Sequence, residues 1–280
     1  ADQVPHSKII YDCMDELSHF KNAPITLISQ EKTLLTLSDV VFTGGKSLYE
    51  AKQNLTENVY CFPSSVDEKH FQTRSQTQKP SDMATIPGPV VGFYGVIDER
   101  IDTEFLGKVA EKLPDVSFVM IGPVVKIDTA TLPRFKNIYY LGGKNYAQLP
   151  EYLSHFDIAL MPFALNDSTK FISPTKTLEF IAAKKPIIST PITDVVRDYS
   201  EVAKIVATVD ECAQAIREHL SETLQQKSQR YALQQEILER TSWDKTVTAM
   251  KNILHELHEQ KVEQIQKSSH QGLFSTWAVA

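Results

Sequence analysis

The feature of this sequence that most limits its fold is the alternation of short apolar runs with helical patterns. The alternation continues from residue 8 to residue 222. Strands that alternate with helices in this way are typical of a parallel sheet with helices packed on its faces. The sequence therefore predicts an α/β protein.

The apolar runs form two series. The first series comprises residues 8–13, 39–44 and 58–63. The second series comprises residues 90–95, 117–122, 137–142, 156–163, 186–190 and 203–208. Six strands with their helices make a complete doubly wound, Rossmann-like domain, whereas three make a meagre core for an independent domain. The first series is therefore expected to form only part of a domain.

The segment between the two series and the segment after them set the expected domain boundaries. Residues 67–89 are polar, contain several prolines and show no period, which is typical of an interdomain linker. After the second series the patterns are helical, and the last dozen residues have no period. We therefore expect a partial N-terminal α/β domain over 1–75, a linker over 76–89, a Rossmann-like domain over 90–240, a C-terminal helix over 241–268 and a tail over 269–280.

Composition excludes several classes of function. The net charge of −6 arises from mixed signs, so no basic surface for nucleic acid is expected. No apolar run approaches the ~18 residues of a membrane-spanning helix. The three cysteines are odd in number and lack metal-site spacing, which favours free thiols in the cytoplasm. No D-x-D arrangement or metal cluster is visible, and Asp12 and Asp15 are interpreted as turn-capping residues.

Ligands of open α/β sheets bind at the carboxyl ends of the strands, where helix N-termini point at them. Gly95 ends the first strand of the second series and can let the backbone approach a ligand, although no G-x-G-x-x-G fingerprint is present. Arg100 then either faces a phosphate or pairs with Asp98 or Glu99. Gly142 and Gly143 either offer main-chain groups to a planar base or form a plain tight turn.

The segment "FISPTKTLEF IAAKKPIIST" (171–190) carries the densest polar chemistry. Pro174 suits the first position of a helix, with Ser173 as its cap. The N–H groups of residues 175–177, Thr175 and Lys176 among them, then form an anion site that the Lys176 charge strengthens.

Glu179 lies three residues after Lys176 and four after Thr175, on the same helix face. A carboxylate one turn from a phosphate site suits the two hydroxyls of a ribose. The alternative is an ion pair between Glu179 and Lys176 on a solvated face, and spacing alone favours neither.

"SPTKTLEFIAAKKPIIST" (173–190) resembles the signature of GT-B glycosyltransferases, most nearly the family 4 type, group 1. The resemblance extends to "YDCMDELSHF" (11–20), "SDVVFTGGKSLYEAK" (38–52), "VYCFPSSVDEKHF" (59–71) and "SWDKTVTAM" (242–250). The resemblance covers positions 8 to 255 and rests on the order and spacing of these segments.

The resemblance implies a specific donor site. Glu179 would hold the ribose hydroxyls. The backbone of Ser173 and Pro174, with Lys176 and Arg100, would face the diphosphate, and Gly142–Gly143 would lie near the base. The final helix would cross back to the first, acceptor-side domain.

Two departures from the family pattern stand out. A glutamate that often contacts the donor sugar lies eight residues before the ribose-binding one in the family, and here that position is Phe171. The family's first domain also usually has more residues before a segment like 11–20, so the chain is expected to be N-terminally incomplete.

The resemblance predicts a hexosyltransferase-like glycosyltransferase. It would move a sugar from a nucleotide-diphosphate donor to a glycan, lipid or small acceptor, with no cofactor and no metal. Two alternatives stay open: a nucleotide-sugar epimerase of the same fold, and an inactive nucleotide-binding fragment. No nucleic-acid partner or transmembrane segment is expected, and peripheral membrane contact is left open.

Overall fold

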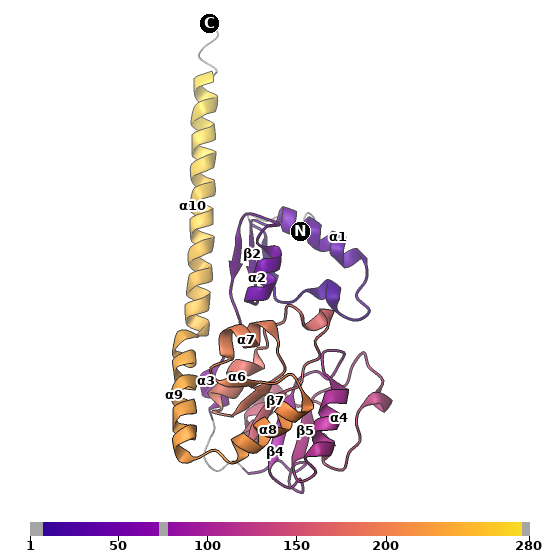
Figure 1. Ribbon diagram of the computed structural model, residues 1–280. Coiled ribbons are helices and arrows are strands. Elements are labelled where there is room, and N and C mark those ends of the chain that lie inside the picture. Colours follow the sequence, from indigo (N-terminus) through magenta and orange to yellow (C-terminus); the bar gives the residue numbers. More distant parts are fainter. Residues whose placement is uncertain (1–7, 73–77, 276–280) are drawn as a thin grey trace. The chain divides into compact units, whose positions relative to one another are not determined.

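The structure is a computed structural model that describes residues 8–72 and 78–275, with side chains described as far as residue 260 (Figure 1). The chain divides into two compact units, residues 1–240 and residues 241–280. The first unit contains two separate parallel sheets, of three and six strands in the described residues. The expected α/β fold class with parallel sheets is confirmed, and all nine predicted strand runs form strands.

The six-stranded sheet has the order β6-β5-β4-β7-β8-β9, and every pairing is parallel. Its strands are β4 (Val90–Tyr94), β5 (Ser117–Ile121), β6 (Ile138–Tyr140), β7 (Ile158–Met161), β8 (Ile187–Ser189) and β9 (Ala203–Ile205). The strand order reverses between β4 and β7. The carboxyl ends at such a switch point are where open α/β sheets bind ligands.

Helices flank this sheet (Figure 1). They are α3 (Glu68–Phe71), α4 (Thr103–Lys112), α5 (Leu149–Ser154), α6 (Lys176–Ala182), α7 (Thr193–Tyr199), α8 (Val209–Leu220) and α9 (Leu224–Arg240). Helix α4 contacts α8, while α6 contacts α3 and α9. Local sequence sets where helices begin: the Asp102 carboxylate accepts a 2.8 Å hydrogen bond from the Phe105 N–H, which fixes the start of α4.

Strands β4, β5 and β7 are buried along their whole length and form the centre of a large hydrophobic core. Buried strands of a parallel sheet carry near-continuous apolar runs because helices cover both faces. Packing is close enough that a Cβ on Gly92 would lie 2.2 Å from the Phe156 ring. This core gives the carboxyl ends of β4 and β7 a rigid base.

The three-stranded sheet contains β1 (Ile10–Cys13), β2 (Val40–Thr43) and β3 (Val59–Cys61), with helices α1 (Thr26–Leu37) and α2 (Lys46–Lys52). Its separate core is small, built from Cys13, Leu35, Val41, Leu48 and Val59. This size agrees with the expectation that the first series forms a meagre core.

The segment between the sheets is more structured than its composition indicated. It contains the short helix α3, and Val66, Phe71, Met83 and Ile86 belong to the large core of the six-stranded sheet. Apolar residues too sparse to show a period can still anchor a connection by tertiary packing. The domain boundaries at residues 75 and 89 stay a prediction.

In its described residues, the second unit, 241–280, contains helix α10 (Trp243–Ser275). The tail expected over 269–280 begins inside this helix, and residues 276–280 lie outside the described residues. That this helix crosses back to the first domain stays a prediction. Within the described chain, no helix combines the length and apolarity that crossing a membrane would need.

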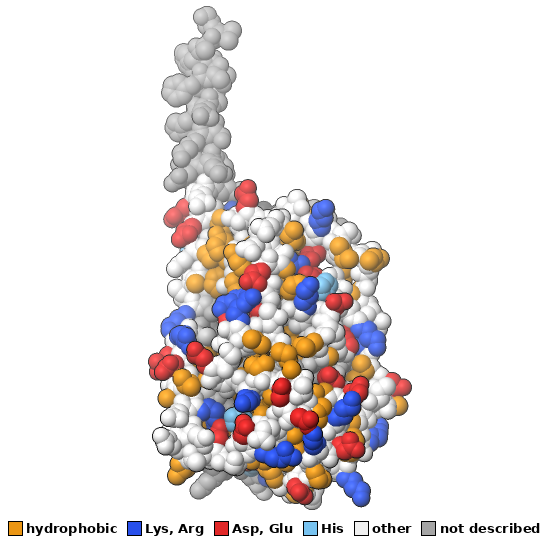
Figure 2. Space-filling view, viewed as in Figure 1, with side chains coloured by type: hydrophobic (Ala, Val, Ile, Leu, Met, Phe, Trp, Pro, Cys, Tyr) orange, Lys and Arg blue, Asp and Glu red, His pale blue; other side chains and the backbone are white. Residues whose placement is uncertain are grey.

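In the part of the chain that the structure describes, short 3-10 helices occupy four connections: η1 (Leu17–His19), η2 (Thr129–Thr131), η3 (Tyr146–Gln148) and η4 (Asp167–Thr169). On the face shown in Figure 2, acidic and basic side chains are interspersed.

Candidate functional site

A cleft of about 440 Å³ opens between the two sheets of the first unit. Six residues predicted for the donor site line it: Gly95, Arg100, Ser173, Pro174, Thr175 and Lys176. From the three-stranded sheet it is lined by Met14, Asp15, Gly44 and Ser64. Met14 follows β1, Gly44 follows β2 and Gly95 follows β4, so the cleft lies where the strands of both sheets end. Open α/β sheets bind their ligands at this position, outside the carboxyl ends of the strands.

Lys176, the first residue of α6, lies across the end of β4. Its Nζ is 5.7 Å from the centre of the Phe93 ring and 5.9 Å from that of Phe163. Gly95 makes this position available, because a Cβ there would lie 2.6 Å from Lys176 Cε and its φ is +139°. Burial lowers the pKa of Lys176, against the opposing effect of Glu179. The ammonium group is therefore poorly solvated and favours an anionic partner.

Arg100 lines the same cleft while it pairs with Asp98. Its Nε lies 3.0 Å from Asp98 Oδ1 and its Nη2 lies 2.8 Å from Oδ2, and Asp98 is only 2 % exposed. The pairing with Asp98 that the sequence left open is therefore present. It occupies only part of the guanidinium, which has five N–H donors. Arg100 can thus be held by Asp98 and still offer N–H groups to the cleft.

The start of α6 differs from the prediction. The helix begins at Lys176 with Thr175 in the cap position and no side-chain cap, so the prediction that Ser173 caps this helix is wrong. The Thr177 N–H donates a 3.1 Å hydrogen bond to the Pro174 carbonyl, which closes a turn before the helix begins. The predicted set of anion-binding amides therefore shrinks to those of Thr175 and Lys176, because the amide of Thr177 is already used.

Glu179 lies one turn after Lys176 and is half-buried. Its Oε2 accepts a 2.7 Å hydrogen bond from the hydroxyl of Tyr94, the last residue of β4. Burial raises the pKa of Glu179, against the opposing effects of this hydrogen bond and of the Lys176 charge. Glu179 is absent from the cleft lining, so it lies beside the cleft and not in its wall.

Gly142 and Gly143 also lie outside the cleft lining. The Gly142 carbonyl accepts a 2.8 Å hydrogen bond from Gly122, and the φ of +68° at Gly142 suits a glycine. A Cβ on Gly142 would meet no atom within 4 Å, and one on Gly143 would meet nothing nearer than Pro123 at 3.8 Å. The loop therefore forms a turn that faces open space.

Sequence reasoning missed Asp15 and Tyr94. Asp15 was interpreted as a turn cap, but its half-buried side chain lines the cleft. Burial raises the pKa of Asp15, while the charges of Arg100 and Lys176 act in the opposite direction. The one sequence signal for Asp15 as a site residue was its place in segment 11–20, which carries part of the family resemblance.

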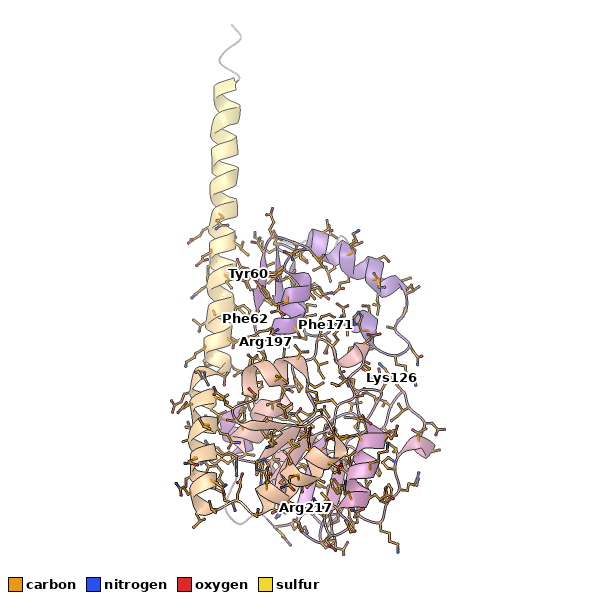
Figure 3. All side chains as sticks on the ribbon, viewed as in Figure 1. Tyr60, Phe62, Lys126, Phe171, Arg197 and Arg217 are labelled. Carbon is orange, nitrogen blue, oxygen red and sulfur yellow. The ribbon has the colours of Figure 1, made fainter. Side chains whose placement is uncertain are left out.

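Phe171 is absent from the cleft lining. It packs against the small core of the three-stranded sheet, with its ring centre 5.5 Å from that of His19 (Figure 3). At this position the chain has an apolar contact between its two sheets where the family often has a carboxylate.

Polar contacts between α2 and α7 hold the two sheets together beside the cleft. Asp194, whose side chain is fully buried, accepts a 3.0 Å hydrogen bond from the Ser47 N–H. A Cβ on Gly45 would lie 2.5 Å from this carboxylate. Arg197, labelled in Figure 3, pairs with Glu50 at 3.0 Å. In the part of the chain that the structure describes, no three His, Cys, Asp or Glu side chains gather as metal ligands would.

Residues 88–225 match the family model described as glycosyl transferases group 1. Over 201 residues the chain is 27 % identical to TuaH of Bacillus subtilis (strain 168), a proposed glycosyltransferase of teichuronic acid biosynthesis. This match covers 65 % of the chain and 50 % of TuaH, so the chain spans about half the length of this relative.

Solved structures share the fold at low sequence identity. A sucrose-phosphate synthase from Thermosynechococcus elongatus matches with a TM-score of 0.71 and 15 % identity, covering 92 % of this chain and 70 % of that one. HepE from Anabaena, solved in complex with UDP and glucose, matches with a TM-score of 0.69 and 15 % identity, covering 90 % of this chain and 72 % of its own. Residues 88–225 thus match a glycosyltransferase domain, and the chain shares the fold of the GT-B glycosyltransferases.

Proposed function

We propose that the protein transfers a sugar from a nucleoside-diphosphate donor to a glycan, lipid or small-molecule acceptor. The observation that carries this proposal is that Lys176 and Glu179 lie one turn apart on helix α6. One turn of helix presents a cation inside the cleft and a carboxylate beside it. A nucleoside diphosphate offers the matching pair, an anionic diphosphate next to a ribose diol.

Lys176 and Arg100 would meet the diphosphate. In the transfer, the bond between the anomeric carbon and the diphosphate breaks and its electrons leave with the diphosphate. An acceptor hydroxyl oxygen forms the new bond, and its proton goes to the departing diphosphate. Fixed positive groups aimed at the leaving oxygens stabilise that charge without reorganisation. The amides of Thr175 and Lys176 add donors, Ser173 and Pro174 shape the wall, and Gly95 keeps the strand end free of a side chain.

Glu179 would accept hydrogen bonds from the ribose hydroxyls. Tyr94 holds Oε2, which leaves Oε1 for a ligand. Hydrogen bonds to a charged group contribute roughly 1.5–3 kcal/mol each. Gly142 and Gly143, on an open turn, would lie near the base.

The comparisons support transfer over the other two activities. HepE was solved with UDP and glucose, the two halves of a nucleotide sugar, and TuaH is a proposed glycosyltransferase. No observation favours an epimerase or a non-catalytic nucleotide-binding protein. Three free cysteines, two of them buried, support a cytoplasmic site of action as part of the proposal.

Thermal denaturation in the presence of UDP, GDP, ADP and TDP tests the proposal. A ligand at about a hundred times its Kd stabilises the folded state by ~2.7 kcal/mol, which is a shift of several degrees. We expect one nucleotide to stabilise the parent and Glu179→Ala to lose most of that shift. Glu104→Ala, which changes an exposed glutamate of α4, should keep it. The absence of a shift with all four nucleotides would contradict the proposal.

A further inference from the structure

Tyr146 presents an exposed aromatic ring beside the candidate donor site. It begins the 3-10 helix η3, three residues after Gly143, and it is 54 % exposed. An exposed aromatic ring on a loop is commonly mobile, so its support decides whether it can act as a binding surface.

The Tyr146 ring is supported from behind by two aromatic side chains. It stacks on His70 with ring centres 4.3 Å apart and planes 8° from parallel. The ring of Phe71, which is 1 % exposed, meets Tyr146 edge-on at 5.5 Å and His70 edge-on at 4.9 Å. One face of Tyr146 is therefore covered and the other is left to solvent.

Hydrogen bonds fix both partners of this stack. His70 Nε2 lies 3.1 Å from the carbonyl oxygen of Tyr146, so the ring nitrogen donates to the backbone of the residue it stacks on. The Asp67 carboxylate caps α3 by accepting a 3.1 Å hydrogen bond from the His70 N–H. The Asn145 N–H donates to Gln148 Oε1 at 3.1 Å, which holds η3. The Tyr146 ring is thus fixed before any ligand arrives.

The stack adjoins Glu179. Helix α3, which carries His70, packs against α6, which carries Glu179. Burial raises the pKa of Glu179, and the His70 charge acts in the opposite direction. The pKa of Tyr146 is raised mainly by burial and secondly by the charge of Glu179, so the three side chains interact electrostatically. The Gly142–Gly143 turn, which precedes η3 in the chain, also has open space beside it, because a Cβ on Gly142 would meet no atom within 4 Å.

We propose that the exposed face of Tyr146 is the surface on which the base of the bound nucleotide stacks, with His70 as the support that fixes the ring. This inference rests on the proposed function and adds the residue that binds the base. The ligand is an aromatic base attached to the ribose at Glu179. Stacking requires only a ring of the right orientation, because every base has a π face.

Isothermal titration calorimetry of UDP, GDP, ADP, TDP and inorganic pyrophosphate tests the inference on the parent and three variants. Tyr146→Ala removes the ring, Tyr146→Phe keeps it, and Tyr231→Ala removes a partly exposed tyrosine of α9. We expect Tyr146→Ala to weaken the preferred nucleoside diphosphate roughly 10- to 100-fold, with Tyr146→Phe and Tyr231→Ala within about twofold of the parent. Pyrophosphate, which has no base, should bind all four proteins alike.

Each other outcome overturns the inference in a different way. If Tyr146→Ala binds the nucleoside diphosphate as the parent does, the base stacks elsewhere and the proposed function stands. If Tyr146→Ala weakens pyrophosphate as much as the nucleotide, Tyr146 supports the site structurally and does not bind the base. If no nucleotide binds the parent, the proposed function fails together with the inference. The unliganded Tm of each variant reports whether it has folded.

Discussion

The hydroxyl of Tyr94 donates a 2.7 Å hydrogen bond to Oε2 of Glu179. Tyr94 is 3 % exposed and ends the central strand β4, while Glu179 belongs to α6 beyond the switch point. Burial, followed by the charge of Glu179, raises the pKa of Tyr94 well above its usual value, so the hydroxyl stays a donor. The bond ties a buried strand to the carboxylate proposed to hold a ribose, and it fixes one oxygen of that carboxylate.

Tyr94→Phe removes this bond and keeps the ring. We expect nucleotide affinity to fall roughly 3- to 10-fold, because the carboxylate loses a charge-assisted partner and its pKa rises further. Calorimetry with the preferred nucleoside diphosphate measures the effect. Tyr199→Phe, at another buried tyrosine, is the matched control and should bind as the parent does. Equal affinity of Tyr94→Phe and the parent would show that the hydrogen bond does not prepare Glu179 for the ligand.

The sheets could be predicted from sequence because their strands are buried runs bounded by polar residues. Val90–Tyr94 and Ile158–Met161 are apolar and wholly buried, and such runs mark a parallel sheet without any tertiary information. Segment 67–89 was interpreted as a linker because it lacks a period. Phe71 and Met83 anchor it by single contacts with the large core, and no local pattern shows such contacts.

For the candidate site, sequence reasoning assigned Lys176 and Gly95 to one donor site because both lie in strand-to-helix connections of the second series, and the structure brings both to the cleft. It did not find the Tyr94–Glu179 bond or the Tyr146–His70 stack. These join residues 85 and 76 positions apart, on elements whose spacing only the fold sets. The predicted cap at Ser173 was wrong because a turn closed by Thr177 and Pro174 delays the start of the helix.

The pH dependence of binding should follow Glu179 on its acid side. Burial raises the pKa of Glu179 above the 4.5 of an ordinary glutamate. As the pH falls, Glu179 is therefore protonated, and loses its negative charge, at a higher pH than an ordinary glutamate. Affinity is therefore present above this raised pKa and is lost as the pH falls through it. Titration with the nucleotide sugar of the preferred base measures this, because its diphosphate does not titrate in the range. In Glu179→Gln the acid limb should be absent, and its persistence would assign it to another group.

On its alkaline side, the pH dependence of binding should follow Lys176. Burial lowers the pKa of Lys176 below the usual 10.5, so the ammonium loses its proton earlier than an exposed lysine does. Affinity for the diphosphate should fall as the pH rises through that lowered pKa. Lys176→Arg, which stays charged, should remove this alkaline limb even if it binds more weakly. An unchanged alkaline limb in Lys176→Arg would show that Lys176 is not the cation involved.

Gly95→Ala should damage the cleft by two separable effects. The φ of +139° strains any residue with a Cβ, and the new methyl group would lie 2.6 Å from Lys176 Cε. Gly142→Ala carries strain alone, because its φ is +68° and its Cβ would meet no atom within 4 Å. We expect both variants to have a lower Tm, and only Gly95→Ala to lose pyrophosphate affinity. Equal loss in both would assign the effect to backbone strain and not to Lys176.

Asp15→Asn should strengthen the binding of small anions. The Asp15 carboxylate lines the cleft together with Lys176 and Arg100, and it offsets part of the positive charge that a diphosphate would meet. Removing one negative charge from a partly desolvated cleft should improve pyrophosphate affinity by about 3- to 10-fold at low salt, and less at high salt. Asp12→Asn makes the same change in net charge at an exposed position of β1 and should have little effect. Equal effects from the two variants would mean that pyrophosphate responds to net charge alone and binds away from the Asp15 side of the cleft.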